Sequence, residues 1–197
     1  METGAETLWA VILGAVLATV GGFAATQMEA FFRRRDRERG AARLFGEILS
    51  VLELITRLAN EARERGDPYG PFTMRLLRAV RRETEVYDRN REALYDLRDA
   101  NLRAQIHALL VRVTLALDGV FDASSQIALT QSAAGALGPD DPARTELMIR
   151  LGALVEERQA AFDYAIETVG QTGPIISVLR PLAKQTFDAY ALVVRNP

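Results

Sequence analysis

The sequence predicts an all-α protein in which an N-terminal transmembrane helix extends into a cytoplasmic bundle of four to five helices. Three observations predict this fold class. A run of 22 residues, Thr7 to Met28, carries no charged side chain. Further along the chain, apolar residues recur three and four positions apart, which is the spacing of a helix face. The alternating apolar pattern that half-buried strands need does not occur.

The uncharged run is long enough to cross a bilayer. At 1.5 Å per residue it measures about 33 Å, and the hydrocarbon core of a membrane is about 30 Å thick. A helix of this length in a soluble core would show a polar face, and this run shows none. A cleaved signal peptide is the alternative. It needs a basic start and a shorter apolar segment, and no Lys or Arg precedes Thr7. The sequence therefore favours an uncleaved anchor.

The charges that follow the run predict its orientation. Five of the seven residues from 33 to 39 are arginines, namely Arg33, Arg34, Arg35, Arg37 and Arg39. The arginine-rich flank of a membrane helix stays in the cytoplasm. Residues 1–32 are thus predicted to form a short outside tail and the transmembrane helix, and residues 33–197 a bundle on the inner face of the plasma membrane. Membrane lipid is an expected partner of these arginines, although their role in orientation already accounts for them.

The first cytoplasmic helix is expected to continue the anchor, because no Pro occurs from Leu8 to Asp67 and only Gly40 and Gly46 weaken it. Its predicted inward row is Leu44, Ile48, Val51, Ile55, Leu58 and Ala62, widened by Phe45, Leu49, Leu52 and Ala59. The loop 66–72, with two prolines and two glycines, ends it.

A second helix should direct Leu76, Leu77, Val80, Tyr87 and Leu94 inward. Its other face is ionic, with Arg81 and Arg89 each one turn from Glu85.

Two capping residues predict where the next helices begin. Asp99 should cap a third helix that runs to about Ala136, and Asp141 followed by Pro142 should start a fourth. The third helix has Leu102, Ile106, Leu109, Val113, Leu117, Val120 and Phe121 inward. The fourth has Leu147, Met148, Leu151, Leu154, Val155, Phe162 and Ile166 inward. Gly170 to Pro174 ends the fourth helix, and a last helix is expected over Ile175–Val194 with a kink or a restart at Pro181.

Residues 86–112 carry the pattern Val86-Tyr87-x-x-Asn90, then Leu94-x-x-Leu97, then an apolar helix. This stretch resembles small bacterial proteins of unassigned function that have one N-terminal membrane helix and a short helical cytoplasmic part. The resemblance implies the same architecture and no activity. We expect Tyr87 and Asn90 to face the third helix or the turn at residues 95–99, with the buried amide of Asn90 bonded to backbone there.

The sequence holds no catalytic or metal-binding signature. His107 is the single histidine and has Ala104 three residues before it, so the Glu-x-x-His pair of helical metal sites is missing. Phosphate-binding glycine loops and a nucleophile elbow are also missing. Asp118 and Asp122, one turn apart, could do acid–base work, but the favoured interpretation is that both face solvent or that Asp122 bonds to Ser124 or Ser125. No enzyme activity and no cofactor are therefore expected, and a net charge of −2 argues against a nucleic-acid partner.

Small residues recur every four positions in the uncharged run: Ala10, Gly14, Ala18 and Gly22. Such a ridge lets a second membrane helix approach closely, and packing of this kind drives helix association in lipid. The expected partner is another membrane protein or a second copy of the chain.

Three functions remain open from the sequence. The first is a membrane-tethered adaptor or scaffold that presents a helical surface at the inner face of the membrane. The alternative is a signalling or sensor module that transmits a change along the continuous membrane helix. The third, and least favoured, is an enzyme centred on Asp118 and Asp122.

Overall fold

The computed structural model describes residues 3–66 and 68–188, with the backbone alone for residues 3–13, 15 and 16. These residues form five α-helices and one 3-10 helix, and they contain no strand. The helices are α1 (Thr3–Glu64), α2 (Pro71–Arg89), η1 (Arg91–Asp96), α3 (Ala100–Gly135), α4 (Pro142–Val169) and α5 (Thr172–Ala183). The prediction of an all-α fold is confirmed.

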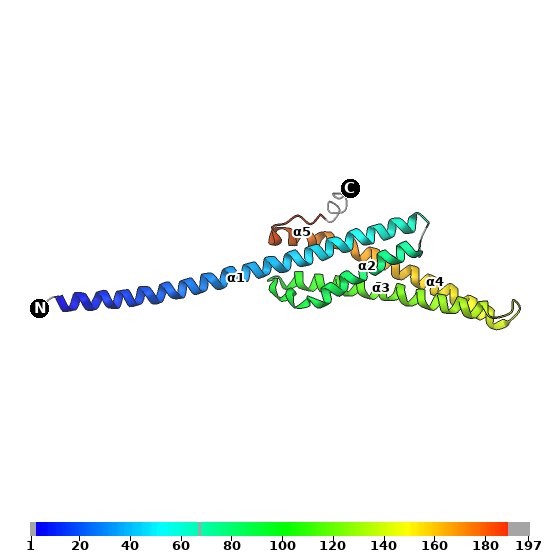
Figure 1. The fold of residues 1–197 in the computed structure, drawn as a ribbon, viewed down its shortest axis with the longest axis horizontal. Coiled ribbons are helices and arrows are strands. Elements are labelled where there is room, and N and C mark those ends of the chain that lie inside the picture. Colours follow the sequence, from blue (N-terminus) through cyan, green and yellow to red (C-terminus); the bar gives the residue numbers. More distant parts are fainter. Residues whose placement is uncertain (1–2, 67, 189–197) are drawn as a thin grey trace.

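Helix α1 is one unbroken helix of 62 residues. At 1.5 Å per residue its length is about 93 Å. It passes through Gly40 and Gly46 without interruption, which confirms the predicted continuity between the N-terminal run and the first bundle helix. Its N-terminal part extends alone from one end of the bundle (Figure 1). All side chains from Leu17 to Arg37 are exposed, and full burial starts at Ala41.

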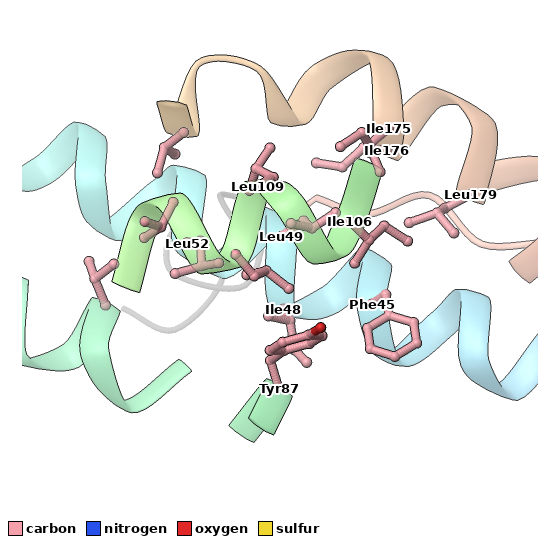
Figure 2. Packing of buried hydrophobic residues seen from close by; sticks show 14 of the residues in the cluster. Phe45, Ile48, Leu49, Leu52, Tyr87, Ile106, Leu109, Ile175, Ile176 and Leu179 are labelled. Atoms are coloured by element: carbon pink, nitrogen blue, oxygen red, sulfur yellow. The ribbon is translucent and has the colours of Figure 1, made fainter. Parts of the chain in front are cut away.

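The bundle forms around the C-terminal half of α1. Phe45, Leu49 and Leu52 of α1 are fully buried, and they gather with side chains from α2, α3 and α5 (Figure 2). The other labelled members of this cluster are Ile48, Tyr87, Ile106, Leu109, Ile175, Ile176 and Leu179. Each large apolar side chain stabilises the fold by roughly 1.5–3 kcal/mol when it leaves water. Most of the row predicted as the centre of this face, including Leu44, Val51 and Ile55, is only half-buried.

Helix α3 is a long, apolar element of the bundle. In the described part of the chain it alone is long and apolar enough to cross a membrane, by length and composition. It supplies twelve buried residues to the interior, from Leu102 to Ala134, and this position accounts for its composition. The side chains of the predicted N-terminal membrane helix lie partly outside the described residues, so that membrane crossing stays a prediction.

The predicted helix starts are confirmed at two caps. The Asp99 carboxylate accepts hydrogen bonds from the backbone N–H groups of Asn101, at 2.8 Å, and Leu102, at 3.2 Å. The Asp141 carboxylate accepts one from Ala143 N at 2.8 Å, with Pro142 in the first helical position. These bonds satisfy N–H groups that a helix start leaves without partners.

The inward face predicted for the fourth helix is wrong in part. Met148 and Val155 are 52% and 41% exposed, whereas Leu154 and Phe162 are buried as expected. The physical reason is that the α3–α4 hairpin extends past the ends of α1 and α2 (Figure 1). Two helices alone cannot cover the whole apolar stripe of α4.

The predicted last helix is also wrong in its bounds. α5 ends at Ala183, and Lys184 follows in the left-handed conformation with φ 52° and ψ 42°. Pro181 lies inside the helix, two residues before its end, where its ring and missing N–H oppose further extension. The segment 184–188 is not helical, and the remainder of the predicted range, 189–194, lies outside the described residues.

The ion pairs expected within α2 are replaced by a contact between helices. Arg81 pairs with Asp118 of α3 instead of Glu85. Arg89 donates from Nε to the backbone carbonyl of Glu85 at 3.2 Å. Spacing along one helix therefore did not identify the partner of Arg81, since a neighbouring helix offered a nearer carboxylate.

Gly46 should resist substitution because the ring of Phe187 lies against it. A Cβ atom added at Gly46 would overlap the ring of Phe187, which is 7% exposed. Gly46→Ala should therefore lower the free energy of unfolding by about 1–3 kcal/mol, the usual cost of overpacking. Thermal unfolding of the purified chain in detergent measures this.

Gly40→Ala is the matched control, because a Cβ there meets nothing within 4 Å. It should stabilise by about 0.5–1 kcal/mol, the helix preference for Ala over Gly. In a Phe187→Ala background, Gly46→Ala should no longer destabilise. Equal effects at both glycines would refute this close packing.

Candidate functional site

The N-terminal part of α1, η1 and the start of α3 form a groove between them. Its volume is 490 Å³. We call it the junction groove. It is lined by Gln27, Ala30, Phe31 and Arg34 of α1, by Tyr95, Asp96, Leu97 and Arg98 of η1 and the turn after it, and by Arg103 of α3.

The α1 wall of the groove follows from helical periodicity. Positions 27, 30, 31 and 34 lie three or four apart and share one face. The same face continues through Glu38 to the buried residues Ala41, Ala42 and Phe45. The groove is therefore the extension of the core-facing stripe of α1 beyond the point where the bundle covers it.

The opposite wall is the turn at the end of η1, residues 94–98, which is fixed by burial and by hydrogen bonds. Leu94 and Leu97 are buried, while Tyr95 between them is 81% exposed. Arg103 donates from Nη1 to the carbonyl oxygens of Leu97, at 2.6 Å, and Arg98, at 3.1 Å. The buried leucines and these bonds fix the turn, so the ring of Tyr95 is held outward at the mouth of the groove.

Glu38 joins the two walls. Its carboxylate forms an ion pair with Nε of Arg98 at 3.2 Å and accepts a hydrogen bond from the backbone N–H of Arg98 at 3.3 Å. The Arg98 guanidinium also lies 5.9 Å from the ring centre of Phe31. Arg34 is exposed and makes no ion pair with the described residues. With three arginines and Asp96, the lining carries a net positive charge.

A hydrogen-bonded pair joins α2 to α3. The hydroxyl of Tyr87 and Nδ1 of His107 are 2.6 Å apart, and Nη2 of Arg91 lies 3.4 Å from Nε2 of the same ring. Burial raises the pKa of Tyr87. Tyr87 faces α3, as the sequence predicted. Among the described residues, no cluster of three or more His, Cys, Asp or Glu side chains could hold a metal ion.

The prediction for Asn90 is wrong. Its side chain is exposed, and its Nδ2 donates to the carbonyl of Val86, 2.8 Å away and one turn back in the same helix. The amide thus bonds locally at the end of α2 rather than to the turn at residues 95–99. A short polar side chain near a helix end has this local partner within reach, and burial is not required.

The small-residue ridge is not covered by the chain itself. Gly14, Ala18 and Gly22 are exposed, and a Cβ added at either glycine meets nothing within 4 Å. Ala10 lies in α1, but its side chain is outside the described residues. The ridge therefore stays a predicted contact for a partner.

The predicted arginines have different surroundings. Arg33, Arg34, Arg35 and Arg37 are exposed, and Arg39 is half-buried. Arg33 pairs with Glu29 on the same helix. Of the five, only Arg34 lines the junction groove.

The two aspartates considered for acid–base chemistry have separate roles. Asp118 is bound by Arg81, and Asp122 is exposed. Ser124 donates to the backbone carbonyl of Val120 at 2.7 Å, not to Asp122. Neither aspartate lines the junction groove.

The sequence did not reveal that Tyr95, Arg98 and Arg103 belong to one site with Arg34. The contact between Glu38 and Arg98 joins residues 60 positions apart, and no local pattern marks such a pairing. The motif that suggested the bacterial resemblance supplies Leu94 and Leu97, the buried side chains of this turn. Comparison with protein families, curated proteins and solved structures gives no match for this chain.

Tyr87→Phe should weaken the bundle by about 0.5–1.5 kcal/mol, because it removes the hydroxyl bonded to His107. Chemical denaturation of the detergent-solubilised chain measures this. Tyr95→Phe is the control and should have no effect, since Tyr95 is 81% exposed.

The hydrogen bond between Tyr87 and His107 also predicts how the stability of the bundle changes at alkaline pH. Burial favours the neutral form of Tyr87, so its contribution to stability is complete below the ordinary pKa of 10.0 and is lost as the pH rises through the raised pKa. Tyr87→Phe should reduce the loss of stability above that pH. An identical alkaline profile in the variant would contradict the role of this hydroxyl.

Proposed function

We propose that this protein is a membrane-tethered adaptor that presents its helical bundle at the inner face of the membrane. Residues 1–32 would be the short outside tail and the anchor, and residues 33–197 the cytoplasmic bundle. One observation carries the proposal: the uncharged run and the centre of the bundle belong to the same unbroken helix, α1. From Leu17 to Arg37 no other part of the described chain buries that helix.

The chemistry at the end of the run supports the tether. Phe31 and Phe32 are both about half exposed and meet edge to face, with ring centres 5.9 Å apart. Exposed aromatic rings next to arginines suit the boundary between hydrocarbon and water. In a soluble protein, the exposed Leu17, Val20 and Phe23 would instead form a costly apolar surface.

Exposed apolar side chains on α3 and α4 support the adaptor role. Leu115, Leu129 and Ile149 are 64%, 69% and 72% exposed on α3 and α4. Exposed large apolar side chains suit contact with a protein partner. The pairing of Asp118 with Arg81 occupies one of the two groups that an enzyme hypothesis would require.

A signalling module is the alternative. It is favoured by the same continuity of α1, because Phe45, Leu49 and Leu52 would shift in the core if the N-terminal part rotated or moved along its axis. Such a module would pass a change at the membrane into the bundle. The adaptor hypothesis needs fewer assumptions, since it does not require a second conformation of the bundle.

The topology can be tested with a reporter fused after Pro197 that works only in the cytoplasm. The native fusion should be active. Replacing Arg33, Arg34, Arg35, Arg37 and Arg39 together by Glu should reduce activity, because the retained flank loses its positive charge. Activity of a periplasmic reporter at the same position in the native chain would contradict the proposed orientation.

The adaptor role can be tested through the small-residue ridge. The double variant Gly14→Ile, Gly22→Ile should still insert, since Ile is apolar, but it should lose its membrane partner because the helices can no longer approach closely. The measurement is recovery of crosslinked partners from native membranes. A single cysteine at Ala18 should also crosslink two copies if the partner is the chain itself.

The control for crosslinking is a cysteine at Leu17, one position off the ridge. The chain has no native Cys, so the two sites can be compared directly. Equal crosslinking at Ala18 and Leu17, with unchanged partner recovery in the double variant, would contradict packing through the ridge. The segment would then act only as a membrane anchor.

A further inference from the structure

We infer that the junction groove binds the head group of an anionic phospholipid from the leaflet around α1. The inference rests on the proposed function, because it needs the N-terminal part of α1 to lie in a bilayer. It adds a defined site, made from the anchor helix and a turn more than sixty residues away along the chain.

The first step is the depth of the groove. The last uncharged residue of the run is Met28. The head-group layer beyond the hydrocarbon is about 5–7 Å thick on each side, or about four helical residues at 1.5 Å each. The groove residues Ala30 and Phe31 therefore lie at head-group level, and Arg34, about 9 Å beyond Met28, follows at the outer edge of that layer. The turn carrying Tyr95 lines the same groove, and the Arg98 guanidinium lies 5.9 Å from the ring centre of Phe31, so the turn lies close to the same level.

The second step is the charge of the lining. Arg34 has no protein ion-pair partner among the described residues. Arg98 uses Nε for Glu38, and Arg103 uses Nη1 for two carbonyls, so each guanidinium keeps further N–H groups to donate. Guanidinium groups bind phosphate through paired N–H donors. Asp96 is the opposing carboxylate of the lining, and it leaves the groove net positive.

The third step is the apolar part of the groove. Phe31 is 52% exposed and Tyr95 is 81% exposed, one on each wall. A free phosphate has no apolar part that could pack on these rings, whereas the glycerol and first acyl carbons of a lipid can pack on them. Tyr carries an apolar ring and a polar hydroxyl, a combination found at membrane interfaces. The walls therefore suit a lipid better than a small anion.

The experiment measures lipid binding to the full chain in a neutral detergent by native mass spectrometry. Short-chain phosphatidylglycerol is compared with phosphatidylcholine and with free glycerol phosphate. The native chain should bind phosphatidylglycerol most tightly. Arg34→Gln should weaken this binding about fivefold, equivalent to ~1 kcal/mol for a basic residue near an anionic surface. Asp96→Asn should strengthen it, which a partly unfolded variant would not do.

Arg35→Gln is the matched control: it removes the same charge from an exposed neighbour that does not line the groove. It should change the affinity little. An equal loss in Arg34→Gln and Arg35→Gln would overturn the site, since general attraction would then explain the binding. Equal affinity for phosphatidylcholine, or for free glycerol phosphate, would also overturn it.

Alkaline carbonate extraction of native membranes separates this inference from the tether. If the native chain and Arg34→Gln both resist extraction but bind phosphatidylglycerol equally, only the groove proposal fails. If the native chain is released by carbonate, the tether itself fails, and the lipid site fails with it.

Discussion

The backbone hydrogen bonding of one long helix is the constraint on which the rest of this molecule depends. α1 has no proline to remove a bond from its ladder, and its two mid-helix glycines, Gly40 and Gly46, are tolerated. α2 and α5 pack against the C-terminal half of α1. The N-terminal part of α1 leaves the bundle without a break in the helix (Figure 1). A stiff rod shared in this way fixes the direction of the exposed part relative to the bundle.

The same rod explains why a site arises at the junction. The core-facing stripe of α1 continues past the end of the bundle. Its next residues, among them Phe31 and Arg34, therefore lie beside the turn at residues 95–98 and stay exposed. Two buried leucines and the Asp99 cap hold this turn, and Glu38 ties Arg98 to α1. A cap and one ion pair would stabilise little on their own. Here they set the relative position of two walls that the core already brings together.

Local chemistry made some features predictable. Asp99, Asp141, Pro142 and the glycine-rich loops gave the helix starts and stops because caps and breakers act within a few residues. Periodicity indicates which face is apolar but not whether another element covers it, so Met148 was placed inward wrongly. The interhelical pair of Arg81 and the lining of the junction groove depend on contacts between distant segments. Linear spacing carries no information about those contacts.

Two kinds of exposed side chain lie at different places along the molecule. Arginines and exposed aromatic rings gather at the end where α1 emerges, whereas Leu129 and Ile149 are exposed on the α3–α4 hairpin. The tip of that hairpin lies at the far end of the molecule from the N-terminus (Figure 1). A tether that holds one end at a membrane would direct the other toward the cytoplasm. The separation of lipid-compatible and protein-compatible surfaces by the length of the bundle is what an adaptor requires, because the two contacts can then form together without competing for space.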